Sequence, residues 1–388
     1  MASSADLTLA MVAGETSGDL LAARLLAGLR PRLPDAHLHG IGGKAMAEYG
    51  FVSDYPMDKL AVRGLFEVLA HYRELKGIRD TLCESLIKEQ PGAFIGVDAP
   101  DFNLDLEFRL KQSGIPTLHF VSPSIWAWRR GRIKKIARAV SHMLVIFPFE
   151  AAIYAEAGIE ATYVGHPLAE VIPLAPDQDA ARDALGLARD ARVLAILPGS
   201  RMSEIRCNAR AFIESAAVLR QRDPALQFVV PMAGDTQRTY FEQLIAQAGL
   251  QNLPLQIVSG RSHEVITAAD AVLVASGTAT LEVALFKKPM VIAYKMNAAS
   301  WHILRLMAYQ PWVGLPNILA RDFLVPELLQ DQATPVNLAD ALWIQLSDEQ
   351  NRRRLQQRFT DMHHELRRDT AEQSAKAVME LLSRHGRL

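Results

Sequence analysis

The fold is decided by the stretch Val193-Leu194-Ala195-Ile196-Leu197-Pro198-Gly199-Ser200-Arg201, taken together with Ala275-Ser276-Gly277-Thr278-Ala279-Thr280-Leu281-Glu282. In each, an apolar run typical of a buried strand ends at a glycine-bearing turn, and helical periodicity follows at once. Glycine lets the backbone approach a ligand closely, and the first amides of a helix lack intrahelical partners, so both turns are candidate anion sites. Either turn alone is better explained as an ordinary strand-to-helix connection. Two in one predicted domain, one with Arg201 and one with Glu282, favour a nucleotide.

Apolar strands alternate with helical patterns on both sides of these turns, which predicts parallel sheets covered on both faces. We therefore predict an α/β protein with two doubly wound, Rossmann-like domains that face a cleft. The expected segments are a first domain over 1–169, a second over 170–345, and helices over 346–388 that pack back on the first domain. Ligands of such sheets lie at the carboxyl ends of the strands.

Composition excludes several classes of protein. The chain has 42 basic and 43 acidic residues and a net charge of −1, so no general affinity for nucleic acid is expected. Cys83 and Cys207 lie far apart, which suits a reducing cytoplasm. The N-terminus lacks the basic region of a signal peptide, and no apolar run reaches the roughly 18 residues that a membrane-spanning helix needs. Binding to a membrane surface remains open.

The ends of the predicted first-domain strands carry polar residues. The first strand is followed by Gly14-Glu15-Thr16-Ser17-Gly18-Asp19, which lacks the G-x-G-x-x-G pattern and disfavours a nicotinamide cofactor. Ser17 or Asp19 is equally well explained as a helix N-cap or as a ligand contact. Asp98 follows the strand Ala93–Val97, where partial burial can raise the pKa of a carboxyl group toward that of a useful base. Asp98 is our candidate base, with capping of a turn as the alternative.

A basic segment follows Ser122-Pro123-Ser124-Ile125-Trp126-Ala127-Trp128 and contains Arg129, Arg130, Arg132, Lys134, Lys135 and Arg138 with no acid among them. Most such runs are solvated helix faces, but an aromatic pair at a strand end suits a phosphate-bearing amphiphile, and each basic residue near an anionic bilayer contributes about 1 kcal/mol. Apolar stripes over Leu60–Tyr72 and Trp301–Val313 are typical of core-facing helices, with acyl-chain or membrane contact as the alternative.

No metal site is expected. Asp177-Gln178-Asp179 matches the D-x-D pattern by which some sugar transferases hold a metal, but it precedes a helical pattern and is better explained as a charge pair at a helix N-terminus. The histidines, including His37, His39 and the pair His363-His364, show no spacing typical of metal ligands.

Seven motifs spread over almost the whole chain belong together. They are Gly14-Glu15-Thr16-Ser17-Gly18-Asp19, Val97-Asp98-Ala99-Pro100-Asp101-Phe102-Asn103, Val121-Ser122-Pro123-Ser124-Ile125-Trp126-Ala127-Trp128-Arg129, Gly165-His166-Pro167, Leu197-Pro198-Gly199-Ser200-Arg201, Ser276-Gly277-Thr278-Ala279-Thr280-Leu281-Glu282 and Leu315-Pro316-Asn317. Jointly they resemble the lipid-A-disaccharide synthase family. The resemblance implies a GT-B glycosyltransferase that joins UDP-2,3-diacylglucosamine to 2,3-diacylglucosamine 1-phosphate, releasing UDP, in lipid A biosynthesis. It also implies a cytoplasmic enzyme bound peripherally to the phospholipid surface of the bacterial inner membrane, without metal or cofactor. A homodimer is left open.

The resemblance also assigns roles to residues. Asp98 matches the general base, which takes the proton of the acceptor 6-hydroxyl, while Glu15, Ser17, Trp126 and Arg129 are expected on the acceptor side. The expected UDP site comprises Gly199, Ser200, Arg201, Ser276, Gly277, Thr278, Glu282, Lys295 and Asn317. A departing UDP develops about two negative charges and a helix N-terminus offers about half a positive one, so Arg201 and Lys295 are the candidate cations.

Two other functions remain as alternatives. A UDP-sugar epimerase of the same architecture would release UDP without an acylated acceptor. A non-catalytic sugar-binding protein would close on its ligand without turnover, although that class usually carries an export signal.

Overall fold

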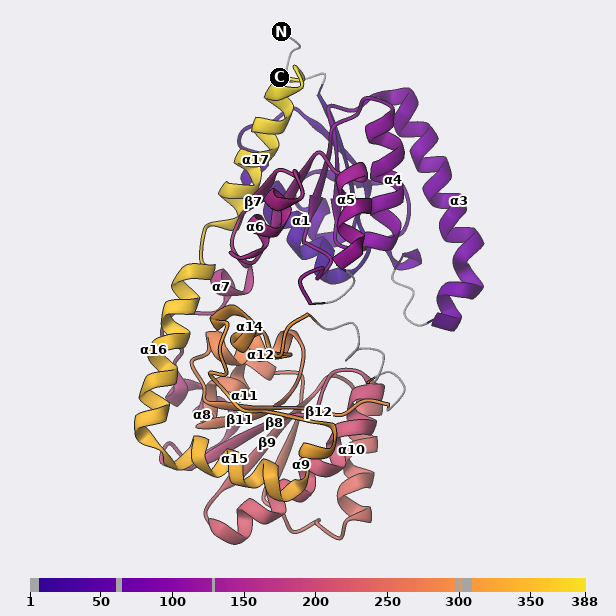
Figure 1. The fold of residues 1–388 in the computed structure, drawn as a ribbon. Helices are drawn as coiled ribbons and strands as arrows, with labels where there is room; N and C mark the ends of the chain where they lie inside the picture. Colours follow the sequence, from indigo (N-terminus) through magenta and orange to yellow (C-terminus); the bar gives the residue numbers. More distant parts are fainter. Residues whose placement is uncertain (1–6, 61–64, 128–129, 298–300, 302–308) are drawn as a thin grey trace. The chain divides into compact units, whose positions relative to one another are not determined.

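The structure, a computed structural model, describes residues 7–60, 65–127, 130–297, 301 and 309–388, without the side chains of 65–72. The chain divides into two compact units, of which unit 1 contains Met1–Pro167 and Glu365–Leu388 and unit 2 contains Leu168–His364. Each unit is built on one parallel sheet with helices packed against it (Figure 1). The predicted class, α/β with two doubly wound domains, is confirmed.

Unit 1 contains a seven-stranded sheet with the order β3-β2-β1-β4-β5-β6-β7. Its strands are β1 (Thr8–Ala13), β2 (His37–Ile41), β3 (Phe51–Ser53), β4 (Ala93–Val97), β5 (Thr117–Phe120), β6 (His142–Val145) and β7 (Ala161–Tyr163). Its helices are α1 (Thr16–Leu29), α2 (Lys44–Ala47), α3 (Leu65–Glu89), α4 (Pro100–Gln112), α5 (Ile133–Ala139), α6 (Glu150–Glu156) and α17 (Thr370–Arg384), with short 3₁₀ turns at Met57–Lys59 and Arg130–Arg132. Helices α1 and α17 pack on one face of the sheet, and α3 and α4 pack on the other.

Unit 2 contains a six-stranded sheet with the order β10-β9-β8-β11-β12-β13. Its strands are β8 (Val193–Leu197), β9 (Gln227–Met232), β10 (Leu255–Ser259), β11 (Ala271–Ala275), β12 (Met290–Tyr294) and β13 (Glu327–Leu329). Its helices are α7 (Leu168–Val171), α8 (Gln178–Leu185), α9 (Met202–Arg222), α10 (Asp235–Gln247), α11 (Ser262–Ala268), α12 (Thr278–Leu285), α14 (Leu315–Ala320), α15 (Pro335–Ser347) and α16 (Glu349–Leu366), with a 3₁₀ turn at Gln330–Gln332. Apolar side chains of α9, α10 and α15 form one core with the sheet.

Both sheets reverse their strand order at one place. In unit 1 the chain moves outward from β1 to β3 and then returns to place β4 on the other side of β1. In unit 2, β8 and β11 are related in the same way. Such a reversal separates the helices that follow the two neighbouring strands and leaves a crevice at their carboxyl ends, where ligands of this architecture bind. We refer to these two places as the switch points of unit 1 and unit 2.

Helix α17, near the C-terminus, completes the core of unit 1. Its side chains Ala375, Val378, Leu381 and Leu382 are buried in the same cluster as β1, β4 and α1. The two helices approach very closely, since a Cβ atom at Gly28 of α1 would lie 2.2 Å from the carbonyl oxygen of Ala371. Any side chain at position 28 would therefore separate α17 from the sheet.

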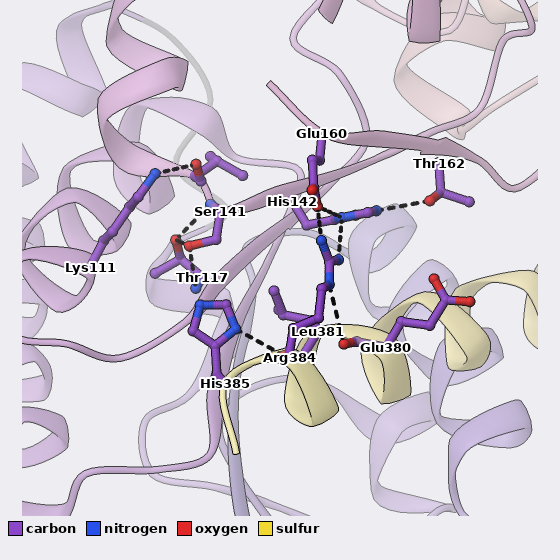
Figure 2. A network of polar contacts seen from close by, with 11 residues as sticks. Lys111, Thr117, Ser141, His142, Glu160, Thr162, Glu380, Leu381, Arg384 and His385 are labelled. Carbon is purple, nitrogen blue, oxygen red and sulfur yellow. Dashed lines mark hydrogen bonds and ion pairs between the residues drawn. The ribbon is translucent and has the colours of Figure 1, made fainter. Parts of the chain in front are cut away.

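Polar contacts fix the far end of α17. Figure 2 shows Arg384 between Glu160 and His142: its guanidinium pairs with the Glu160 carboxylate, and its Nη2 lies 3.3 Å from His142 Nδ1. The other ring nitrogen of His142 lies 2.8 Å from the Thr162 hydroxyl. Burial lowers the pKa of His142, which favours the neutral ring. The cavity of about 780 Å³ beside this network lies near the first residues of β6 and β7, away from the strand ends that carry ligands.

The C-terminal segment differs from the prediction. We expected all of 346–388 to pack on the first domain, but only Glu365–Leu388 belongs to unit 1. Helix α16 stays with unit 2 because it is anchored there: His363 Nδ1 lies 2.6 Å from Lys287 Nζ, and His363 Nε2 lies 2.8 Å from the Ala169 carbonyl oxygen. The link between the domains also begins slightly earlier than expected, after Pro167.

Most of the two apolar stripes cannot be compared with the structure. The side chains of 61–72, and most of the stretch 301–313, lie outside the described residues. None of the helices in the described part of the chain combines the length and apolarity needed to cross a membrane.

Candidate active site

The switch point of unit 1 brings two predicted residues together. Asp98 follows β4, and Glu15 is the residue that precedes α1 at the end of β1. The two loops touch, since a Cβ atom at Gly14 would lie 2.8 Å from the Cβ of Ala99. Glu15 is close enough to Asp98 for its negative charge to raise the pKa of that carboxyl group. Two acidic side chains therefore share this edge of the sheet.

Neighbouring residues fix the backbone of Asp98. Both Asp98 and Ala99 adopt left-handed conformations, with φ of 52° and 42°. The Asp98 N–H donates to the Phe120 carbonyl at 2.9 Å, and Asn103 Nδ2 donates to the Asp98 carbonyl at 2.8 Å. An unusual backbone conformation maintained by surrounding contacts is common at functional sites.

The surroundings of Asp98 favour a base. Burial is the largest influence and raises the pKa of its carboxyl group, as does Glu15, while His119 and a hydrogen bond from the Ala99 N–H lower it. Burial beside Glu15 thus outweighs these two influences, and the pKa of the carboxyl group lies above its usual value.

A buried pair behind Asp98 escaped the sequence analysis. His119 Nδ1 lies 2.7 Å from Glu107 Oε1, and both side chains are fully buried. A Cβ atom at Gly96 would lie 2.1 Å from the same Glu107 oxygen, so glycine in β4 makes room for the pair. Burial raises the pKa of Glu107. Two features of the sequence pointed to this pair, a histidine in an apolar strand and a glycine two residues before Asp98.

A second buried acid, Glu150, holds Trp126 of the aromatic segment after β5. Trp126 Nε1 donates to Glu150 Oε1 at 2.9 Å, and its ring meets Phe147 and Phe149 edge to face at 6.0 and 5.4 Å. Burial raises the pKa of Glu150 to about 7. Ser17 is exposed near the start of α1 and makes no capping bond there, while Arg129 lies outside the described residues.

Asp19 has a structural role that neither alternative foresaw. Its buried carboxylate accepts hydrogen bonds from the N–H groups of Gly43, Ala45 and Met46, at 2.9 to 3.1 Å. It thus caps the first turn of α2 rather than its own helix.

The switch point of unit 2 places both glycine turns side by side. β8 and β11 pair in parallel with Leu197 opposite Val274, so Gly199-Ser200-Arg201 and Ser276-Gly277-Thr278 leave the sheet at neighbouring positions. Lys295 follows β12, the next strand, and its N–H donates to Asn208 Oδ1 of α9 at 2.8 Å. Three adjacent strand ends thus carry the predicted nucleotide residues.

The first turn already holds a carboxylate. Glu204 Oε2 accepts hydrogen bonds from the N–H groups of Ser200 and Arg201 at 3.0 and 3.3 Å. Gly199, at φ 118°, is required because a Cβ atom there would lie 2.5 Å from the Glu204 side chain. In this structure these amides bind an internal anion, as in the return half of a capping box. The Arg201 side chain is 73% exposed.

The second turn has more open space. Gly277 adopts φ 148°, and a Cβ atom there would meet nothing within 4 Å. The Ser276 hydroxyl donates to the Val313 carbonyl at 3.3 Å, and Glu282 Oε2 lies 3.4 Å from His263 Nε2. Thr278 begins α12 in this open space. The turn therefore has room for a ligand group close to its backbone.

Asn317 is placed differently from the other predicted residues. It is fully buried in α14; its Nδ2 donates to the Val325 carbonyl and to Glu327 Oε1 at 2.9 and 2.8 Å, and its Oδ1 accepts from the Val325 N–H. Both side-chain donors are thus used within the fold. Asn317 shapes the segment beside the second turn and has no N–H left for a nucleotide.

The D-x-D match lies at the start of α8. Asp177 is the N-cap of α8, where its carboxylate accepts from the Ala180 N–H at 2.9 Å. Asp179 lies 3.9 Å from Arg189 Nη1. Both acids therefore serve the start of a helix, as expected.

Comparison with known proteins identifies the family of the chain that carries these two switch points. The family model described as "Lipid-A-disaccharide synthetase" matches residues 9–378. The chain belongs to the lipid-A-disaccharide synthase family. It is 54% identical to the lipid-A-disaccharide synthase of Aromatoleum aromaticum over 97% of this chain and 96% of that protein. It is 56% identical to that of Albidiferax ferrireducens over 97% of each. As a member, it is a glycosyltransferase of lipid A biosynthesis, and the family implies a UDP sugar and a lipid-linked acceptor as substrates.

Solved structures support the fold of a lipid-A-disaccharide synthase family member. UDP-GlcNAc 2-epimerase from Neisseria meningitidis, bound to UDP-GlcNAc, is 11% identical, with a TM-score of 0.64 over 97% of this chain and all of that one (100%). The calicheamicin glycosyltransferase CalG4 is 15% identical, with a TM-score of 0.58 over 97% of this chain and 98% of that one. At such identities the likeness shows the shared GT-B fold alone.

Proposed function

We propose that the chain joins UDP-2,3-diacylglucosamine to 2,3-diacylglucosamine 1-phosphate in a single inverting displacement. The acceptor 6-hydroxyl loses its proton to a base as its oxygen attacks C1 of the donor sugar. The bond between C1 and the diphosphate oxygen breaks, and its electron pair leaves with UDP. Membership of the family supports this reaction over the epimerase and over a non-catalytic sugar-binding protein.

Asp98 is the proposed base. The observation that carries the assignment is its position at the switch point of unit 1, with a backbone held by Phe120 and Asn103 and a raised pKa. A carboxylate with a pKa closer to neutrality accepts a hydroxyl proton more readily than an ordinary surface aspartate. His119 acts through Asp98, because its interaction with that carboxyl group opposes the increase in the pKa of Asp98.

The switch point of unit 2 is the proposed UDP site. Arg201 and Lys295 supply positive charge to the leaving diphosphate, and Glu282 accepts hydrogen bonds from the ribose hydroxyls. Ser276, Gly277 and Thr278 form the open turn that the phosphates approach. At the first turn, a phosphate takes the place of the Glu204 carboxylate on the Ser200 and Arg201 amides, so that one anion replaces another.

The acceptor is proposed to lie along the switch point of unit 1. Trp126 offers an aromatic face fixed by Glu150. Glu15, Ser17 and Arg129 complete the set of proposed acceptor contacts. We retain Asn317 as a residue that positions the segment beside the UDP turn.

Peripheral binding to the inner face of the bacterial inner membrane is also proposed. The basic segment after Trp126 supports it less strongly than the sequence suggested, because α4 supplies acids: Arg132 pairs with Asp101, and Lys135 Nζ lies 2.6 Å from Asp105 Oδ1. Lys134 and Arg138 remain exposed. Cosedimentation with vesicles that contain anionic phospholipid should weaken in a Lys134→Glu/Arg138→Glu variant; unchanged binding would contradict this placement.

The proposed reaction is tested by product analysis. Purified protein is incubated with radiolabelled UDP-2,3-diacylglucosamine, with and without 2,3-diacylglucosamine 1-phosphate. We expect a labelled disaccharide 1-phosphate and UDP only when the acceptor is present, and undiminished turnover in a chelator. Release of UDP without acceptor would instead support an epimerase, and binding without turnover a sugar-binding protein.

A further inference from the structure

Three potential metal ligands converge at the edge of unit 1 opposite the switch point. His37 and His39 belong to β2, and Glu89 is the last residue of α3. One ligand atom from each lies within 4.8 Å of the others. We propose that these residues hold a zinc ion. The spacing of the two histidines alone gave no such signal, because the third ligand comes from a distant part of the chain.

His39 provides the strongest argument. Its Nδ1 lies 2.8 Å from Asp54 Oδ2, so Nε2 is the ring nitrogen available to an ion. Nε2 is buried, lies 3.1 Å from Glu89 Oε2, and makes no hydrogen bond within the described part of the chain. A cation bound by both atoms would satisfy this buried nitrogen and the carboxylate oxygen beside it.

The distance suits two ligands of one ion. Zinc binds imidazole nitrogen and carboxylate oxygen at about 2.0 to 2.2 Å in tetrahedral sites, which separates two ligand atoms by roughly 3.3 Å. Two atoms bound to a common ion do not point at each other. The absence of hydrogen-bond geometry between His39 and Glu89, among the described residues, is therefore what a shared ion requires.

His37 completes the set. Residues two apart in a strand lie on the same face, and the rings of His37 and His39 stack with centroids 5.2 Å apart. His37 is exposed, so its ring can turn by the small amount needed to close on an ion. Two imidazoles and a carboxylate are a ligand set that favours zinc over magnesium or calcium.

The groups around the three ligands also favour a cation. Asp54 Oδ2 contacts His39 Nδ1, the ring nitrogen that would not bind the ion, as outer carboxylates do at zinc sites, where they orient the histidine ring. Glu89 ends a helix of 25 residues, and the negative end of the helix dipole attracts positive charge. Water fills the remaining coordination position.

The ion would have a structural role. His37 is the first residue of β2, so the site lies at the opposite edge of the sheet from Glu15 and Asp98. It would join the end of α3 to β2 and, through Asp54, to the segment after β3. Glycosyl transfer does not involve it, and the proposal is independent of the proposed function.

The test is a zinc titration of the full chain, prepared without a histidine tag and treated with a chelator. Calorimetry should detect one Zn²⁺ per chain. His37→Ala and Glu89→Gln should each weaken binding by at least about tenfold, and Asp54→Asn by roughly 10- to 100-fold. His364→Ala, an exposed histidine of α16, is the matched control and should bind as the unchanged chain does.

Because His37 and Glu89 are both exposed, these variants should fold, which circular dichroism verifies. Cobalt provides a second readout, since Co²⁺ in a tetrahedral site gives an intense visible band that the His37 and Glu89 variants should lose. Failure of the unchanged chain to bind Zn²⁺ at micromolar concentrations would overturn the proposal. Binding that survives both substitutions would overturn it as well.

Discussion

The two switch points share one topology and differ in charge. In each unit the sheet reverses between two parallel strands, β1 and β4 or β8 and β11, and the loops after those strands meet. The switch point of unit 1 carries two acids, Asp98 and Glu15. The switch point of unit 2 carries two glycine turns, with Arg201 and Lys295 nearby. In this fold, the sheet topology determines where ligands bind. The side chains of the loops determine whether the site is suited to accept a proton or to bind an anion.

The carboxylates of Asp98 and Glu204 extend the contrast between the two switch points. Asp98 has a raised pKa because it is partly buried beside another acid. Glu204 lies instead on two backbone N–H groups, where it occupies the position proposed for a phosphate. Under the proposed function, the carboxylate at one switch point acts as a base, and the carboxylate at the other gives way to a ligand.

The largest effect is expected from Asp98→Asn. Removal of the base should reduce kcat by at least about a hundredfold, while UDP affinity stays near normal because the nucleotide is held by unit 2. Steady-state kinetics and calorimetry with UDP measure the two quantities. Asp101→Asn, an exposed acid of α4, is the control and should retain most activity. Near-full activity in Asp98→Asn would remove Asp98 from the mechanism.

A smaller effect is expected from Arg201→Ala. Loss of a cation beside the diphosphate should weaken UDP binding by about tenfold or more and also slow turnover, since charge grows on the leaving group. Arg206→Ala, an exposed arginine one turn further along α9, should bind UDP normally. If both variants bind UDP equally, the cationic role belongs to another residue.

Glu204→Gln should change binding in the opposite direction. A neutral amide competes less well than a carboxylate for the Ser200 and Arg201 amides, so we expect UDP affinity to rise by about two- to fivefold. Glu214→Gln removes an acid that pairs with Arg210 on the surface of α9 and should have no effect. Weaker UDP binding in Glu204→Gln would mean that the carboxylate supports the turn rather than competing with the ligand.

The smallest effect concerns pH. Protonated Asp98 cannot act as a base, so kcat/KM should fall as pH falls through its raised pKa. Glu15 contributes to that increase, so Glu15→Gln should lower the pKa of Asp98 and move the acid limb of the profile to lower pH, by less than about one unit. Glu48→Gln, outside the switch point, should leave the profile unchanged. A shift to higher pH in Glu15→Gln would contradict the proposed arrangement.

Much of the fold followed from local patterns. Continuous apolar runs between helical segments predicted two parallel sheets, and the glycines of the two turns marked the strand ends of unit 2. Its position at a strand end also made Asp98 the candidate base, because the carboxyl edge of a parallel sheet is where ligands bind.

Several features depend on contacts between distant residues, which periodicity cannot predict. The Glu107–His119 pair joins α4 to β5, and the capping of α2 by Asp19 joins two separate helices. The amide of Asn317 looked available until Val325 and Glu327 were seen to use it. The assignment of α16 to unit 2 could not be predicted because α16 and α17 are both amphipathic, and the contacts of His363 with Lys287 and Ala169 are visible only in the structure.

Hydrogen–deuterium exchange with and without UDP tests the central claim most directly. If unit 2 holds the nucleotide and unit 1 supplies the base, UDP should slow exchange in peptides covering 198–205 and 276–283. Peptides covering 14–19 and 98–103 should exchange as they do in the free protein. Protection at the unit 1 peptides without protection at the two glycine turns would contradict the account.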